Sequence, residues 1–183
     1  IKLNAASGGG SFSLQAPSSS SNNRVFTLPD VADATITTTA TSSNIVQGTS
    51  TTENTFSTTS FVASSLSATI TPKAASSKIL IQSSFLIDTI NNDRQIYVAL
   101  FRSINGGTFT NLSGGSNTAA IGTYGGGARI IEKGSVIRLD TPSYSVGNSI
   151  VYKLYGKTAS SGQDVRITAQ GVEDVMILQE VAA

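Results

Sequence analysis

Apolar and polar residues alternate with a period of two along the middle of this chain. The run 78–87 shows the pattern most strongly, because its odd positions Ile79, Ile81, Phe85 and Ile87 are apolar. Successive side chains of a strand point to opposite faces of a sheet, whereas a helix repeats about every 3.6 residues. The alternation therefore predicts a strand that turns one face towards a hydrophobic core.

Similar short runs follow as far as the end of the chain. The run 95–101 is apolar on both faces, which predicts a central strand buried on both sides. Asn105-Gly106 is typical of a tight hairpin turn, and Lys133-Gly134 predicts a second one. The strand-like runs recur at spacings of about 8–12 residues, as in sandwiches and barrels, and none carries the apolar stripe of a helix. We therefore expect an all-β fold.

The leading part of the chain has a different composition. Runs of Ser, Gly and Asn at 7–11 and 18–23 separate short strand-like pieces, and such compositions are typical of linkers. We predict an extended arm or stalk of β and coil structure over residues 1–50 and a β-sandwich domain over residues 51–183. Since Ile1 is a poor natural start, we also expect a longer parent polypeptide.

The arm carries few apolar residues and cannot close a core alone. We expect three copies to wrap around a shared axis, where their strand edges would pair. The predicted trimer contacts are the apolar side chains of the arm, namely Phe12, Leu14, Phe26 and Ile36.

The composition narrows the possible chemistry. The chain of 183 residues has no His, Cys or Trp, a charged fraction of 13% and a net charge of +1. The usual general base, metal ligand and thiol nucleophile are therefore missing. Lys and Arg are scattered rather than clustered, and no apolar run approaches the roughly 20 residues that span a bilayer. We predict no catalytic residue, metal site or cofactor, no nucleic-acid binding and no membrane insertion.

The oxygen-rich turn at 91–93 is the strongest remaining site candidate. Asp88 and Asp93 flank it, and two carboxylates facing each other across a cleft would be needed by a glycosidase. Calcium would also use such oxygens, although the spacing of an EF-hand is missing. We favour a simple turn, because Asn and Asp readily adopt left-handed conformations.

Two tyrosines, Tyr124 and Tyr144, lie in predicted loops beside Gly, Ser and Thr. Exposed rings can act as apolar platforms for sugars, but a loop tyrosine can also pack its ring over a sheet edge with its hydroxyl in water. Loops on a rigid scaffold commonly carry recognition. The candidates for receptor binding are therefore Asn91, Asn92, Asp93, Tyr124 and Tyr144.

Several motifs resemble those of a known group of proteins. Leu14-Gln15-Ala16-Pro17, a Ser/Asn spacer and Val25-Phe26-Thr27-Leu28-Pro29-Asp30 resemble a short module in structural proteins of tailed bacteriophages, notably marine and cyanobacterial ones. The family often has Gly after Pro-Asp, where this chain has Val31. Leu66-Ser67-Ala68-Thr69-Ile70-Thr71-Pro72 and Met176-Ile177-Leu178-Gln179-Glu180-Val181 resemble a globular domain of such proteins. The resemblance implies a jelly-roll-like antiparallel β-sandwich at the end of a virion appendage, assembled as a homotrimer.

The resemblance leads to one expected function with three alternatives. We expect the distal domain of a tail fibre on the exterior of a phage particle, bound to other virion proteins and to a host-surface glycan or protein. A head fibre or capsid decoration protein would use the same fold. A polysaccharide-degrading appendage enzyme would need a carboxylate pair, and a bacterial adhesin would lack the phage-like module.

Overall fold

The structure is a computed structural model that describes residues 2–4, 11–13, 44–113 and 119–181. The chain divides into two compact units, Ile1–Ile36 and Thr37–Ala183. In the first unit, β1 (Lys2–Asn4) pairs antiparallel with β2 (Ser11–Ser13), with Phe12 opposite Leu3. The other predicted trimer contacts, Leu14, Phe26 and Ile36, lie outside the described residues. The trimer therefore stays a prediction.

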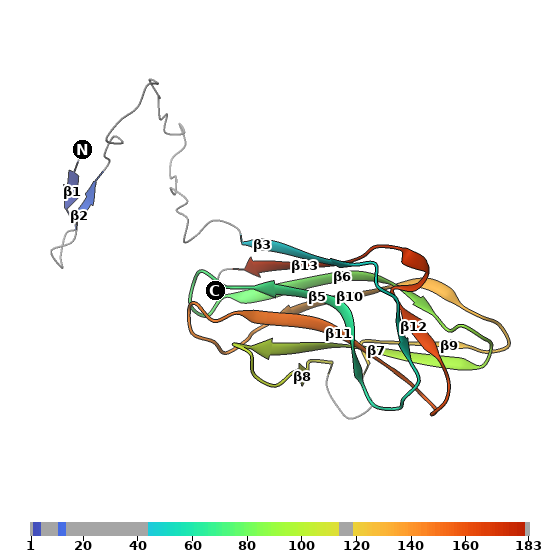
Figure 1. Ribbon diagram of the computed structural model, residues 1–183. Coiled ribbons are helices and arrows are strands. Elements are labelled where there is room, and N and C mark those ends of the chain that lie inside the picture. Colours follow the sequence, from blue (N-terminus) through green and yellow to red (C-terminus); the bar gives the residue numbers. More distant parts are fainter. Residues whose placement is uncertain (1, 5–10, 14–43, 114–118, 182–183) are drawn as a thin grey trace, which may run out of the picture. The chain divides into compact units, whose positions relative to one another are not determined.

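The second unit contains two antiparallel sheets (Figure 1). In the first, called sheet I here, the long strands follow the order β3 (Ile45–Ser50), β13 (Asp174–Val181), β6 (Lys78–Asp88) and β10 (Ile131–Asp140). β13 pairs with the first part of β6, and the last residues of β6 pair on the same edge with β12 (Val165–Ile167). β12 in turn pairs with β4 (Asn54–Phe56). A 3-10 turn, η1 (Ala169–Gly171), connects β12 to β13.

Sheet II holds β5 (Val62–Ile70), β11 (Ile150–Thr158) and β7 (Arg94–Ile104) in that order. Two short strands, β8 (Thr110–Asn111) and β9 (Ile121–Gly125), pair with different parts of the free edge of β7. Asn105 and Gly106 both have positive φ and connect β7 to β8, so the predicted hairpin turn is confirmed.

The order of the strands is that of a jelly roll. The short strands β4 and β12 are left out of this numbering, and β8 and β9 count as one. The eight strands β3, β5, β6, β7, β8 with β9, β10, β11 and β13 are then numbered 1 to 8 along the chain. Their order is 1-8-3-6 in sheet I and 2-7-4-5 in sheet II. Two interlocked Greek keys produce this order. The predicted all-β, jelly-roll-like sandwich is confirmed.

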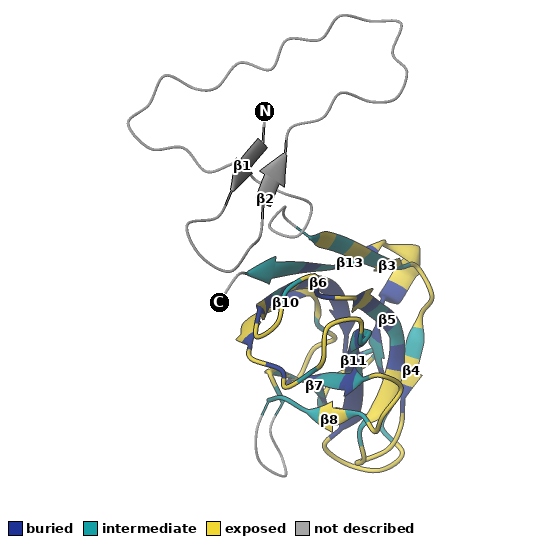
Figure 2. Ribbon diagram, turned by 90° about the vertical axis from the view of Figure 1, so that its left-hand side faces the viewer, coloured by how far each residue is buried: buried dark blue, intermediate teal, exposed yellow. Residues whose placement is uncertain are grey.

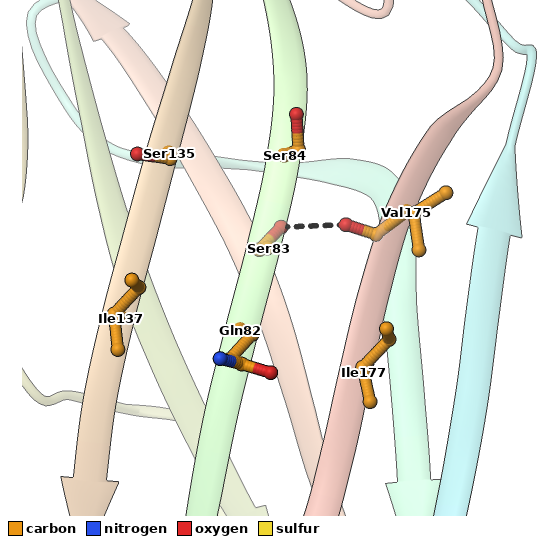
Figure 3. Close-up of a pocket in the computed structure, with 7 residues that line it drawn as sticks. All are labelled: Gln82, Ser83, Ser84, Ser135, Ile137, Val175 and Ile177. Carbon is orange, nitrogen blue, oxygen red and sulfur yellow. Dashed lines mark hydrogen bonds between the residues drawn. The ribbon is translucent and has the colours of Figure 1, made fainter.

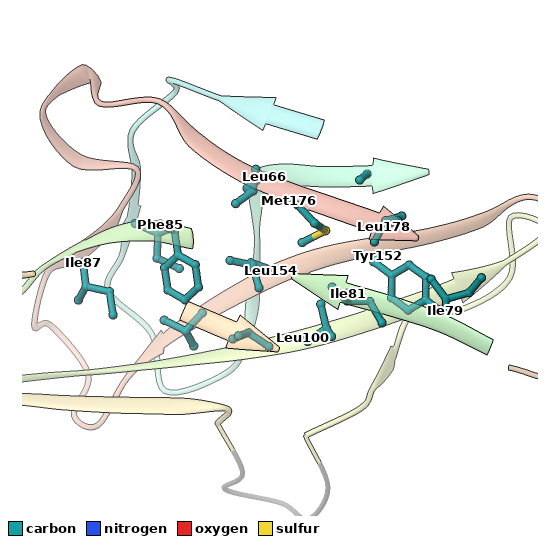
Figure 4. Packing of buried hydrophobic residues seen from close by; sticks show 14 of the residues in the cluster. Leu66, Ile79, Ile81, Phe85, Ile87, Leu100, Tyr152, Leu154, Met176 and Leu178 are labelled. Carbon is teal, nitrogen blue, oxygen red and sulfur yellow. The ribbon is translucent and has the colours of Figure 1, made fainter. Parts of the chain in front are cut away.

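The core fills the space between the sheets (Figure 2, Figure 4). Ile79, Ile81, Phe85 and Ile87 of β6 have no exposed surface, as their alternation predicted. Tyr152 is also fully buried, and its hydroxyl donates a hydrogen bond to Asp140 at 2.8 Å. Burial contributes about 25 cal/mol per Å² of apolar surface, so this core is the main favourable term in the stability of the sandwich.

Two expectations from the sequence need correction. Lys133-Gly134 is no turn, because both residues lie inside the continuous strand β10. Gly134 faces the core, where a Cβ atom would lie 2.8 Å from the Phe85 ring, so packing explains the glycine. In β7, Ile96, Val98 and Leu100 are buried, but Tyr97 and Phe101 on the other face are only partly covered.

The edges of the two sheets meet where β3 crosses β5. A Cβ atom on Gly48 would lie 1.9 Å from the backbone oxygen of Ser67, so only glycine allows this approach. Ser50 and Ser65 hydrogen bond through their hydroxyls at 2.6 Å nearby. The sandwich thus takes in β3, which lies within the range predicted as the arm.

Candidate functional site

The turn between β6 and β7 projects from one end of the sandwich. Asn91, Asn92 and Asp93 are all exposed there. The backbone N–H of Asn91 donates to the Thr89 carbonyl at 2.6 Å. This bond closes a γ-turn centred on Ile90, whose φ is 62°. A β-branched residue rarely adopts this conformation, so the turn needs support from its surroundings.

The support comes from Asp88, which is fully buried at the end of β6. One carboxylate oxygen accepts the Ile90 amide at 2.7 Å. Arg129 donates to both oxygens, through Nε at 2.8 Å and Nη2 at 2.6 Å. The Arg129 guanidinium, aided by the Ile90 amide, holds the pKa of Asp88 below its usual value although burial acts in the opposite direction.

The structure brings the turn together with Tyr124, which the sequence analysis placed in a loop but which lies in strand β9 and pairs with Gln95 of β7. The Tyr124 hydroxyl donates to Asp93 Oδ1 at 3.3 Å, and the Gly127 amide donates to the same oxygen at 3.2 Å. The Asp93 amide donates to the Gly125 carbonyl. The Tyr124 side chain, 57% exposed, therefore stands beside the turn and is accessible to a large partner.

Asp88 and Asp93 do not face each other across a cleft. Asp88 has no exposed surface and its carboxylate is occupied by Arg129, while Asp93 is exposed and occupied by Tyr124 and Gly127. Within the described ranges, no group of three or more acidic side chains lies close enough to hold a metal ion. The turn thus has the geometry of a braced loop.

Tyr144 lies at the opposite end of the sandwich. The pairing of β10 with β6 places Ile131 beside Asp88 at the turn and Asp140 beside Ile79 at the far end, and Tyr144 follows Asp140. Its ring packs against the core, and its hydroxyl donates to the Ala74 carbonyl at 2.7 Å. Of the two predicted loop tyrosines, only Tyr124 adjoins the turn.

Glu180 connects three backbone and side-chain donors at the end of the sandwich where Tyr144 lies. Its carboxylate accepts hydrogen bonds from the Lys73 and Ala74 amides and from Asn44 Nδ2 at 2.9–3.0 Å. Burial alone would raise the pKa of Glu180, but these donors hold it below the usual value. The carboxylate is therefore a structural group.

A row of aromatic side chains covers the outer face of sheet II, and the sequence analysis missed it. We call it the aromatic face. Phe101 of β7 stacks on Tyr155 of β11 with ring centroids 4.0 Å apart, and Phe61 meets Phe101 edge-on at 5.7 Å. Phe109 lies 5.8 Å from Tyr155. All four side chains are partly exposed, because sheet II faces the core with its other side.

Two lysines lie among the rings. Lys157 Nζ is 4.8 Å from the Phe61 centroid and 5.3 Å from that of Tyr97, and the residue is only 7% exposed. Lys153 Nζ is 5.7 Å from the Phe109 centroid. Cation–π attraction at these distances holds the rings in place.

Polar but uncharged groups surround the rings. The register of sheet II places Gln95 beside Tyr124 and Gly122 beside Tyr97, so the aromatic face extends to the turn. Further positions on the same side of β5 and β8 carry hydroxyls and an amide, at Ser67, Thr69 and Asn111. No described residue on this side of the sheet II strands is Asp or Glu.

Comparison with known proteins adds no family. No protein-family model matches the chain, and no curated protein matches its sequence. No helix among the described residues is long and apolar enough to cross a membrane. The surface of the sandwich offers one feature suited to a ligand. A row of rings bordered by hydroxyls and amides can stack on a flat polar ligand and hydrogen bond to it.

Proposed function

We propose that this chain is the distal domain of a bacteriophage tail fibre and that it binds a glycan on the host surface without chemical turnover. The placement on a virion rests on the resemblance of its motifs to phage structural proteins. The binding role rests on the aromatic face and the adjoining turn.

The aromatic face suits a sugar, because it combines partly exposed rings with hydroxyls and amides. A pyranose ring has an apolar face of C–H groups that packs on an aromatic ring, while its hydroxyls need donors and acceptors around that ring. Phe101, Tyr155 and Phe109 would provide the apolar contact, and Gln95 and Asn111 the polar one. Such a site is weak alone, and several copies on one fibre would add their affinities through avidity.

One observation carries this proposal: aromatic rings lie outside the core on a sheet face that has no carboxylate. The interior of the sandwich already holds a complete hydrophobic cluster, so the outer rings are not needed to close it. Exposed aromatic clusters bordered by polar groups commonly mark binding surfaces.

Binding of the purified full chain to a glycan array and to intact host cells tests the proposal. Tyr155→Ala should weaken binding at least about tenfold, which corresponds to about 1.4 kcal/mol. Tyr144→Ala serves as the matched control, because it removes a partly exposed tyrosine at the far end. Equal binding by both variants, or no binding by the wild-type chain, would contradict the proposed function.

The position on the particle needs a separate experiment. A gold-labelled antibody against the chain should mark the tips of tail fibres in electron micrographs of the phage. Label on tailless heads would instead support a head fibre or capsid decoration protein.

A further inference from the structure

The outer face of sheet I carries exposed or partly exposed aliphatic side chains on each of its four long strands, although it faces away from the core. Ile137 is 71% exposed, Ile45 58%, Leu139 51% and Ile131 44%. Leu80 and Ile177 lie on the same side and are partly exposed. Isolated exposed aliphatic residues are ordinary, but a continuous group on one sheet face marks an interaction surface.

The register arranges this face as a ridge beside a hollow. Ile137, Gln82 and Ile177 lie side by side on β10, β6 and β13, and Ser135, Ser84 and Val175 form the next row (Figure 3). Because the serines are small, the second row is lower than the first. The result is a shallow hollow of about 180 Å³, lined by three aliphatic side chains together with Gln82 and three serines.

The centre of the face carries no charge. Its outward positions include Lys78, Lys133 and Asp88, and Asp88 lies at the end of β6 with its buried carboxylate paired with Arg129. Lys133 Nζ lies 3.4 Å from Asp174 Oδ1, so its charge is matched by a buried carboxylate. Lys78 begins β6, at the end of the face, and does not oppose the approach of an apolar surface at the centre.

We propose that this face binds a second copy of the same chain, with Ile137 of each copy seated in the hollow of the other. Ile137, the most exposed large apolar side chain, borders an uncharged hollow on the same face. If a two-fold axis lies between the ridge and the hollow, the Ile137 ridge of each copy enters the hollow of the other. An interface in which both copies use the same surface in this way is called isologous. No other partner is needed to explain both features.

The area is sufficient for such a contact. Four strands spaced about 4.8 Å apart and roughly 25 Å long cover a plan area of about 500 Å². Side chains standing on a sheet expose more than its plan area, so one face approaches the roughly 800 Å² per partner of a standard interface. The contact uses only strands β3, β6, β10 and β13 and is independent of glycan binding.

Single cysteines provide the decisive test, because the chain contains none. Full-length Ile137→Cys and Ser84→Cys chains are mixed and oxidised gently. Mixed disulfide dimers should form at least fivefold faster than in a mixture of Ser84→Cys with Val146→Cys. Val146 is the matched control, because it is 57% exposed in the connection between β10 and β11. Equal rates in the two mixtures would overturn the proposal.

Sedimentation velocity of the full chain tests the same contact without a covalent link. Ile137→Asp should raise the dissociation constant of the assembly about tenfold or more, whereas Val146→Asp should leave it unchanged. A wild-type chain that stays monomeric at all concentrations contradicts the proposal. So does an assembly that Ile137→Asp leaves intact, because other residues would then hold it.

Discussion

Replacement of Asp88 should destabilise the sandwich and loosen the turn that it braces. Its carboxylate is fully buried, forms a two-point pair with Arg129, and accepts the Ile90 amide at 2.7 Å. Breaking a buried charge pair costs about 3–5 kcal/mol, and each hydrogen bond to a charged group contributes about 1.5–3 kcal/mol. The Arg129 side chain is 43% exposed and can turn into water, which favours the lower part of this range.

In Asp88→Asn, the side-chain oxygen can still accept the Ile90 backbone amide, but the side-chain NH2 group faces the N–H donors of Arg129. We therefore expect the free energy of unfolding to fall by about 2–3 kcal/mol. Asp88→Ala also leaves the Ile90 amide without its acceptor, and we expect about 3–5 kcal/mol. Urea denaturation at neutral pH, followed by far-ultraviolet circular dichroism because the chain has no Trp, measures both. A change below about 0.5 kcal/mol for Asp88→Asn would refute the reasoning.

The pH dependence tests the same pair from another side. Arg129 lowers the pKa of Asp88 in the fold below the ordinary value of 3.8, so the folded state binds the proton less readily than the unfolded state. The resulting stability is present above the unfolded-state pKa and is lost as the pH falls through the lower folded-state value. The wild-type chain should therefore lose more stability than Asp88→Asn between about pH 5 and pH 2. Parallel curves would contradict the assigned role of Arg129.

Four further variants test other parts of the structure, each by urea denaturation against the wild-type chain. Gly48→Ala should cost about 1–3 kcal/mol, because β3 must move away from the Ser67 carbonyl; an unchanged midpoint would disprove the close crossing. Tyr144→Phe should cost about 0.5–1.5 kcal/mol through the lost hydrogen bond to Ala74, and a neutral result would show that water replaces it. Lys157→Met should cost about 1–2 kcal/mol, more than Lys153→Met, since Lys157 lies between two rings; the reverse order would argue against the cation–π packing.

The alternation of apolar residues was sufficient to locate most strands of the sandwich. Ile79, Ile81 and Phe85 face the core as their spacing predicted, because a period of two directly encodes which side is buried. The order of the strands could not be predicted in the same way. The pairing of β3 with β13 joins residues at opposite ends of the unit, and nothing local in either strand specifies its partner.

The candidate site was predicted only in part, for a related reason. The turn residues and Tyr124 were recognised separately, and their contact through Asp93 depends on the pairing of β7 with β9. The aromatic face was missed because β7 and β11 and the connections around them each contribute only one or two rings. A signal was present: Tyr97 and Phe101 made both faces of β7 apolar, which we interpreted as burial rather than as an outward-facing surface.

The pairing of β3 with β13 also determines how the sandwich responds to mechanical load. The two strands run antiparallel, and Glu180 and Asn44 hydrogen bond where β3 begins and β13 ends. A force that pulls these two ends apart would break the ladder one bond at a time, like a zipper. A force between residue 44 and the turn at 91–93 would instead run along the strands and stretch many bonds at once. A load transmitted from the turn to the start of β3 therefore meets the strong direction of the sheet.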